Sequence, residues 1–356
     1  MKTSSKRKRC ILIVFIVLLL LLIGMCITTA VIMRQNFGRG DYPDPKLSTF
    51  HRYERFAEAY PRENVQFQSG DCTLQGYIYG ADNDKGLLVF AHGIGTGHET
   101  YFGFLTAFID DGWRVFSYDA TGSGNSEGKG TRGLVQSVLD LDAALTFAEQ
   151  DARLCDLPVC VMGHSWGGFA AAAVLDCGHD IVASVSLAGY AYPVEMLDKG
   201  AAGILGNTFA PLFHPFAWGY NKLMFGADAG RNAVDAANSC EVPLFVIHGK
   251  DDTMIPCDTI GIYGHRNEIT NPNAEFEMIE GEYASHSKIL YSDEANTYYA
   301  EFKEEYEQIE AQYPDGVPED VQAEVIAKLD RDLANAPNLE LIAEIEQNGF
   351  SAYEET

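Results

Sequence analysis

The sequence predicts an α/β domain in which helices cover both faces of a mainly parallel sheet. Within residues 65–291, short apolar runs alternate with segments of helical period. Most of these runs are apolar at successive positions, which is typical of parallel strands buried on both faces. The chain has 356 residues and a hydrophobic content of 47%, enough for one large core with appendages.

The first two strands are expected to form a hairpin. Residues 65–69 and 73–79 alternate in polarity, and Ser69, Gly70 and Asp71 supply the turn between them. The remaining elements follow from apolar runs and helical period. Buried strands are expected at 87–91, 114–118, 159–162, 181–187, 244–247 and 275–279, and helices at 100–110, 134–149 and 169–175.

Two segments depart from this alternation. Residues 190–239 are rich in glycine and aromatic residues, and we interpret the region at about 190–240 as a helical cap over the carboxyl edge of the sheet. Residues 293–356 have helical period and contain eighteen acidic against three basic residues. They predict an acidic helical C-terminal extension that is solvated and separate from the core. The main domain therefore spans 64–292.

The N-terminal region predicts a transmembrane helix. Residues 10–33 contain neither a charge nor a proline, and 24 residues of helix can cross a bilayer. Five cations precede this span and two follow it closely, so the positive-inside rule leaves residues 1–9 in the cytoplasm as a basic tail. Residues 34–63 form a juxtamembrane linker in which 47–60 are expected to be a short helix.

A cleaved signal peptide is the competing interpretation of this region. Thr28, Thr29 and Ala30 resemble a cleavage site, although the apolar run is longer than that of a usual signal peptide. We favour an uncleaved signal anchor. Both interpretations place the main domain outside the cytoplasm.

Charge and cysteine content exclude several classes of function. The net charge is −26, and seven of the 25 basic residues lie within residues 1–40, where there is no acid. The main domain therefore repels phosphate backbones, and nucleic acid is excluded as a partner. Six of the eight cysteines lie outside the span, and their number permits disulfides. None has the spacing of a zinc site, and Cys160 and Cys177 lie in apolar contexts that favour buried free thiols.

The sequence around Ser165 has the pattern of a nucleophile elbow. An apolar strand leads into Gly163-His164-Ser165-Trp166-Gly167 and directly into a helix of small residues. The turn places the serine in a strained conformation, and side chains at 163 and 167 would collide with the neighbouring strand and helix. A nucleophilic serine also needs a base, an acid and oxyanion donors.

Candidates for these partners follow in chain order. The loop His92-Gly93-Ile94-Gly95 can supply one oxyanion donor, so we nominate the backbone N–H groups of Ile94 and Trp166 and give His92 a role in loop structure. Asp251 and Asp252 are both eligible as the acid at the end of a strand, and we choose Asp252. The candidate base is His286, on the loop after the last strand.

These four motifs together resemble an α/β-hydrolase of the serine hydrolase branch that includes monoacylglycerol lipases and the S33 serine aminopeptidases. The resemblance spans residues 65–291 and implies the α/β-hydrolase fold with a Ser165, Asp252, His286 triad. The family pattern His-Gly-x-x-Asp selects Asp252 over Asp251. Residues 119–126 resemble Asp-x-Arg-Gly-x-Gly-x-Ser, with Thr121 where the family has arginine. This motif therefore supports the predicted fold, but it does not predict a contact with substrate.

The leading hypothesis for function is a membrane-anchored, extracytoplasmic ester hydrolase that acts on a small-molecule or lipid-like acyl substrate. The anchor brings the apolar cap close to lipid.

The alternative is an aminopeptidase or other amide hydrolase, which needs a carboxylate for the substrate amine, such as Glu195 or Asp198. A non-catalytic binding protein with the same fold is the third possibility. The mechanism requires no cofactor or metal, and no motif indicates a protein partner. The aromatic cap residues are Phe209, Phe213, Phe216, Trp218 and Phe225.

Overall fold

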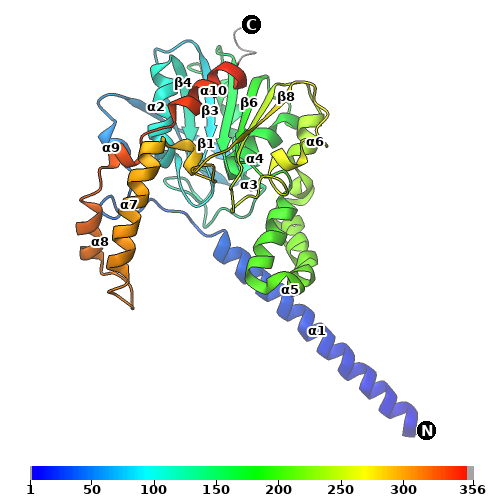
Figure 1. Ribbon diagram of the computed structural model, residues 1–356. Coiled ribbons are helices and arrows are strands. Elements are labelled where there is room, and N and C mark those ends of the chain that lie inside the picture. Colours follow the sequence, from blue (N-terminus) through cyan, green and yellow to red (C-terminus); the bar gives the residue numbers. More distant parts are fainter. Residues whose placement is uncertain (1, 351–356) are drawn as a thin grey trace.

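A twisted eight-stranded sheet forms the centre of the molecule (Figure 1). The computed structural model describes residues 2–350, with side chains from residue 7 onward. The strand order is β1-β2-β4-β3-β5-β6-β7-β8. The strands are β1 (Arg62–Ser69), β2 (Cys72–Tyr79), β3 (Gly86–Ala91), β4 (Trp113–Tyr118), β5 (Val159–His164), β6 (Ile181–Leu187), β7 (Leu244–Gly249) and β8 (Ala274–Ile279).

The sheet is mainly parallel, as the sequence predicts. The hairpin of β1 and β2 and the pairing of β2 with β4 are antiparallel, and every other pairing is parallel. The hairpin turns at Gly70, whose φ of 57° suits glycine. Because β3, β5, β7 and β8 run in one direction, the loops that follow them meet at one edge of the sheet.

Helices bury both faces of the sheet in two separate apolar layers. One layer contains residues of α3, α4 and α6, and the other contains residues of α2 and α10. Because α6 belongs to the first layer, the projecting part of the cap is α5 alone. The helices are α2 (Phe102–Asp110), α3 (Gln136–Gln150), α4 (Trp166–Ala173), α5 (Pro193–Phe225), α6 (Ala233–Asn238) and α10 (Leu339–Glu344).

A single long helix, α1 (Lys2–Asn36), extends away from the domain and contacts α5 near its C-terminal end (Figure 1). Thr29, Met33 and Phe37 are buried and lie four residues apart, so they form one stripe along α1 and its continuation. The span Arg7–Asn36 is long and apolar enough to cross a membrane, and mean hydropathy reaches 3.5 over an 18-residue stretch of it. It fits an anchor or a signal sequence.

The juxtamembrane segment differs from its expected form. The predicted helix over 47–60 is wrong, because only Tyr53–Arg55 form a short 3-10 turn. Side chains of the C-terminal region hydrogen-bond to backbone carbonyl groups of this segment, which a helix would use for its own hydrogen bonds. Arg331 Nε donates to the Ser48 carbonyl at 2.9 Å, and Asn335 Nδ2 donates to the Thr49 carbonyl at 2.9 Å. Tertiary contacts therefore override local helix propensity here.

The C-terminal region also requires a correction. The helices α7 (Asp293–Glu310) and α8 (Glu319–Ile326) are mostly exposed, as expected for a solvated extension. The segment after them is not separate from the core. Leu341, Ile342, Ile345 and Phe350 are buried in the same apolar layer as α2. Asp332 and Glu340 are exposed, whereas Glu346 points inward and accepts from the Trp113 indole N–H at 2.8 Å. The high acidic content of the region is why composition alone suggested full solvation.

All eight cysteines lie within the described residues, and all are free thiols. The permitted disulfides therefore do not form in this structure. Cys160 is fully buried, as its apolar context predicts, and burial raises its pKa to about 12. Cys177 is only partly buried, although its pKa is also raised to about 12, chiefly by burial.

Candidate active site

The strand-to-helix turn between β5 and α4 holds Ser165 in a strained conformation. Its φ of 60° and ψ of −113° are rare for a residue with a side chain. A Cβ at Gly163 would overlap the carbonyl of Gly167, and a Cβ at Gly167 would overlap the carbonyl of Ala91 in β3. The steric reason given for these glycines is therefore confirmed.

A chain of two hydrogen bonds joins Ser165, His286 and Asp252. His286 Nε2 lies 2.8 Å from Ser165 Oγ, and His286 Nδ1 lies 2.6 Å from Asp252 Oδ2. All three side chains are buried. Asp251, the other eligible acid, is exposed and belongs to no part of this chain. The structure thus brings together the three predicted side chains from loops after β5, β7 and β8.

Asp252 is surrounded by donors. Its Oδ1 accepts the backbone N–H groups of Met254 and Ile255, both at 2.8 Å, and its Oδ2 accepts from His286 and from His248 Nε2 at 3.1 Å. Burial by itself would raise the pKa of this carboxyl, but the hydrogen bonds from His248 and His286 outweigh burial and hold the pKa well below its usual range. Asp252 is therefore ionised at neutral pH.

His164 connects the loop of the candidate base to the loop of the candidate oxyanion donor. Its Nε2–H donates to the His286 carbonyl at 2.9 Å, so its Nδ1 accepts the Tyr101 hydroxyl, also at 2.9 Å. The Tyr101 oxygen in turn accepts the Gly93 N–H at 3.1 Å. Burial, assisted by the nearby His286, lowers the pKa of His164 to about 3, which keeps the imidazole neutral as this pattern requires.

The loop after β3 takes its shape from His92. Its Nδ1–H donates to the Gly93 carbonyl at 2.7 Å, and its Nε2 accepts the Ala120 N–H at 2.9 Å. Burial lowers the pKa of His92. These contacts confirm the structural role predicted for this histidine. Ile94 follows Gly93 in the loop, and Trp166 begins α4, whose first N–H groups have no acceptor within the helix.

A buried carboxylate explains the threonine at position 121. Thr121 donates its N–H at 2.7 Å and its hydroxyl at 2.8 Å to Asp140, which lies on α3 and is fully buried. Ser69 and Gln136 donate to the same carboxylate at 2.6 and 2.8 Å. Thr121 therefore fixes the loop to α3.

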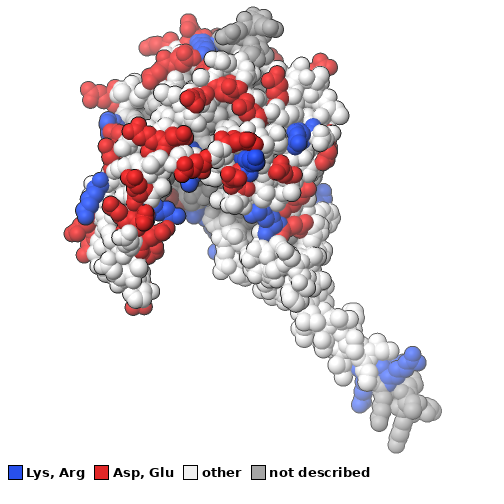
Figure 2. All heavy atoms as spheres, viewed as in Figure 1, with Lys and Arg blue, Asp and Glu red and all other residues white. Residues whose placement is uncertain are grey.

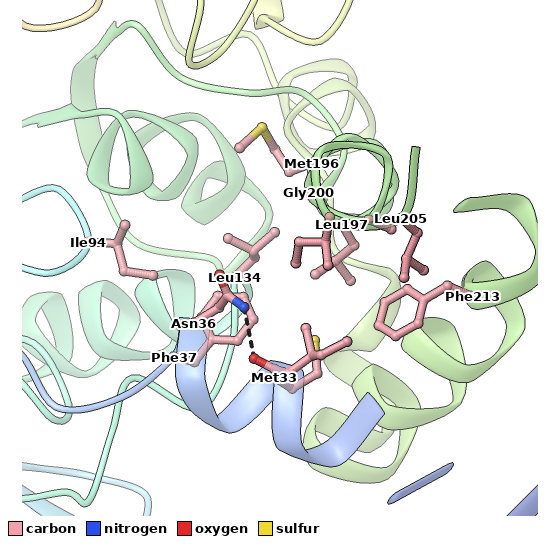
Figure 3. A pocket seen from close by; sticks show the side chains of 13 residues that line it. Met33, Asn36, Phe37, Ile94, Leu134, Met196, Leu197, Gly200, Leu205 and Phe213 are labelled. Atoms are coloured by element: carbon pink, nitrogen blue, oxygen red, sulfur yellow. Dashed lines mark hydrogen bonds between the residues drawn. The ribbon is translucent and has the colours of Figure 1, made fainter. Parts of the chain in front are cut away.

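An apolar cavity of about 210 Å³ lies between the end of α1 and α5 (Figure 3). Its inner end is formed by Ile94 of the candidate oxyanion loop and by Leu134. The Leu134 carbonyl accepts the Trp166 indole N–H at 2.8 Å, so this end adjoins the residue that follows Ser165. The cavity thus extends from the candidate oxyanion loop to the long N-terminal helix.

The two carboxylates considered for an amine substrate are already engaged. Glu195 pairs with His265 at 3.0 Å, and Asp198 pairs with His214 at 2.8 Å. Neither lines the apolar cavity. Among residues 7–350 no cluster of three or more histidine, cysteine, aspartate or glutamate side chains is arranged to hold a metal ion.

Sequence reasoning missed the residues that position the predicted ones, namely His164, His248 and Tyr101. The position of His164 inside the elbow could have indicated its role from the sequence. The position of His248, four residues before Asp252, could have done the same. Tyr101 had none, because it comes from the start of the helical region after the oxyanion loop and reaches His164 only in the folded chain.

Comparisons with known proteins agree with this architecture. The family model described as serine aminopeptidase, S33, matches residues 82–215. A monoacylglycerol lipase of Mycolicibacterium smegmatis is 29% identical over 213 residues, which are 50% of this chain and 75% of the lipase. The uncharacterized protein YfhR of Escherichia coli O157:H7 is 24% identical over 226 residues, covering 60% of this chain and 69% of YfhR.

Among solved structures, an esterase of Pyrococcus furiosus superposes with a TM-score of 0.53 at 20% sequence identity. The match covers 78% of this chain and 98% of the esterase. The chain therefore has the α/β-hydrolase fold. Its sequence resembles the S33 serine aminopeptidase family over residues 82–215 and a monoacylglycerol lipase over 213 residues.

Proposed function

We propose that the protein is a membrane-anchored serine hydrolase that cleaves carboxylic esters through an acyl-enzyme. The observation that supports this most directly is the hydrogen-bonded chain from Ser165 Oγ through His286 to Asp252. Similarity to a monoacylglycerol lipase and to an esterase fold agrees with this chemistry.

In the first half of the reaction, Ser165 Oγ attacks the acyl carbonyl carbon while His286 Nε2 takes the hydroxyl proton. The ionised Asp252 accepts from His286 Nδ1, which keeps Nε2 free to act as a base and stabilises the imidazolium that forms. His286 then gives the proton to the leaving alkoxide. The products of this half are an alcohol and an ester of Ser165.

In the second half, His286 removes a proton from water, and the hydroxide attacks the acyl-serine. Collapse of the tetrahedral intermediate returns the proton to Ser165 and releases a carboxylic acid. In both halves the proposed donors to the negative oxygen are the backbone N–H groups of Ile94 and Trp166. A preorganised donor of this kind contributes about 10²–10³ in rate.

The cavity lining favours an ester with an apolar acyl group over a peptide amine. An aminopeptidase needs a carboxylate to bind the charged substrate amine, and the residues that line this cavity include no acid. Glu195 and Asp198 face histidine partners instead. Amide hydrolysis remains the competing activity within the same mechanism.

The proposed topology has the N-terminus in the cytoplasm and the hydrolase domain outside it. The support is the distribution of charge around α1, with five cations before residue 10 and two between residues 34 and 39. Protease added to the outside of intact cells should therefore degrade the domain. Protection of the domain until the cells are lysed would reverse the orientation.

The test of the reaction uses the full chain in lipid nanodiscs and a short-chain p-nitrophenyl ester. Ser165→Ala should reduce turnover by at least about 10³-fold. Ser123→Ala is the matched control, because Ser123 is also buried and its hydroxyl has no hydrogen-bond partner among the described residues. Leucine p-nitroanilide, an aminopeptidase substrate, is assayed in parallel. Faster cleavage of the anilide would favour the peptidase, and no activity in a folded wild type would favour a non-catalytic protein.

A further inference from the structure

The N-terminal helix lines the apolar cavity that Ile94 of the candidate oxyanion loop also lines. The end of α1 contributes Ile32, Met33 and Asn36, and the facing wall comes from the first half of α5 (Figure 3). We propose that this cavity binds the acyl chain of a lipid ester drawn from the bilayer, and that α1 is the wall that selects long chains. The proposal rests on the proposed ester hydrolysis and names its substrate class.

The lining chemistry fits a hydrocarbon chain. Except for Asn36, every lining residue is apolar or glycine. The Asn36 amide donates to the Ile32 carbonyl at 2.8 Å within its own helix, so this polar group is already engaged (Figure 3). An apolar lining of this kind favours an apolar guest, because a polar group would lose its hydrogen bonds to water there. Its occupant is therefore a hydrocarbon rather than water or a polar group.

The cavity approaches the reaction centre through Ile94, the lining residue of the candidate oxyanion loop. Ile94, at its inner end, follows Gly93, and a Cβ built on Gly93 would lie 3.6 Å from the Ser165 Cβ. A substrate carbonyl held at Ser165 can thus direct its acyl chain past Ile94 into the space between α1 and α5.

The position of α1 identifies the bilayer as the source of the chain. The apolar run over 10–33 is about 36 Å long, at about 1.5 Å per residue, which slightly exceeds the hydrocarbon core of about 30 Å. If the run spans the bilayer, Ile32 and Met33 lie at its outer boundary, the depth of lipid ester groups. Arg34 begins the polar part of the chain.

The cap adds a second apolar surface at the same level. Ile204, Phe209, Leu212 and Trp218 of α5 are large, apolar and exposed, and Ile204 also lines the cavity. Figure 2 shows that the surface of α5 and of most of α1 is largely free of charge, whereas acidic residues cover the domain. Tryptophan is enriched at membrane interfaces. The cavity therefore reaches the surface where lipid chains are close.

Two substitutions fill the cavity from opposite walls. Gly200 lies on α5 with open space around its Cβ position, so Gly200→Leu projects into the cavity without a clash. Ile32→Trp fills it from α1. The matched controls are Gly203→Leu and Val31→Trp, which lie on the same helices outside the lining.

The readout is the ratio of p-nitrophenyl palmitate to p-nitrophenyl acetate hydrolysis by the full chain in vesicles. Both filling variants should lower this ratio at least about tenfold. The loss of a single methylene contact in an apolar pocket already changes kcat/KM by about that factor. The controls should leave it unchanged. An unchanged ratio in the filling variants would overturn the proposal, whatever happens to the absolute rates. Acetate hydrolysis that does not depend on Ser165 would instead overturn the proposed function.

A second measurement tests the source of the lipid without using turnover. In Ser165→Ala vesicles, a diazirine-bearing palmitic acid in the bilayer should crosslink to the first half of α5, and Gly200→Leu should reduce this crosslinking severalfold. Crosslinking confined to residues 11–23 of α1, or unchanged by Gly200→Leu, would overturn the proposal. Palmitate ester placed in the protein's own vesicles should also be cleaved faster than ester in separate vesicles. Equal rates would contradict a bilayer source.

Discussion

The imidazole of His164 donates a hydrogen bond to the backbone carbonyl of His286 at 2.9 Å. The residue before the candidate nucleophile therefore holds the loop of the candidate base. Through Tyr101 the same imidazole also reaches Gly93 of the oxyanion loop. Three loops that are far apart in sequence are thus held in register by one neutral histidine, which fixes the geometry before any substrate arrives.

This histidine should make the protein less stable in acid. Burial lowers the pKa of His164 from 6.5 to about 3. Between these values the unfolded chain binds a proton at this position and the folded chain does not, so stability falls as the pH falls. His164→Gln keeps a donor and an acceptor but does not titrate. Its Tm should decline less steeply than that of the wild type over this range, and parallel declines would contradict the assignment.

His248 should act on the reaction through Asp252. It is fully buried, its Nε2 lies 2.8 Å from the Ile255 carbonyl and 3.1 Å from Asp252 Oδ2, and its Nδ1 has no partner among the described residues. A hydrogen bond to a charged group contributes about 1.5–3 kcal/mol. His248→Leu should therefore lower kcat about tenfold or more with little change in KM, and His248→Gln, which keeps a donor, should lower it less. A change confined to KM would show that His248 acts elsewhere.

Gly167→Ala should severely destabilise the fold. The added Cβ would overlap the Ala91 carbonyl, which belongs to the backbone of β3 and has little freedom to move. We expect a loss of about 3 kcal/mol, at the upper end for overpacked sites. Gly203→Ala is the control, because its Cβ meets nothing within 4 Å. Thermal unfolding of both variants decides the point, and an unchanged Tm for Gly167→Ala would mean that the elbow is looser than described.

The C-terminal segment should be required for stability. Phe350 is 1% exposed and packs edge-on against Phe108 and at a tilt against Trp113. Phe350→Ala should cost about 3–5 kcal/mol of unfolding free energy, as in other buried phenylalanine truncations. Leu339→Ala, at a position that is 66% exposed, should cost little. Equal denaturant midpoints for the two variants would show that this segment is a solvated extension and does not stabilise the core.

Local patterns in the sequence predict much of this site. The glycines around Ser165 predict the elbow because their steric role involves the immediately neighbouring backbone. The parallel strands are predictable because burial on both faces leaves unbroken apolar runs. Asp252 and His286 follow from their places after β7 and β8, together with the family pattern that separates Asp252 from Asp251.

The rest depends on contacts between distant segments. Tyr101 and His164 are 63 residues apart, and Arg331 and Ser48 are 283 apart, so no local pattern predicts either contact. Contacts with distant segments also explain why the predicted linker helix was wrong. For the same reason the sequence predicted α1 as an anchor but gave no indication that it lines a cavity. In the C-terminal region, the large excess of acidic residues hid the apolar stripe of Leu341, Ile342 and Ile345.

Covalent labelling tests the central claim most directly. The full chain in nanodiscs is treated with a fluorophosphonate, which reacts with an activated serine hydroxyl, and the adduct is measured by intact mass and located by peptide mapping. The account predicts one adduct, at Ser165, that is absent in Ser165→Ala and forms at least about 10³-fold more slowly in His286→Ala. An adduct at another serine, or equal labelling rates in His286→Ala and wild type, would contradict it.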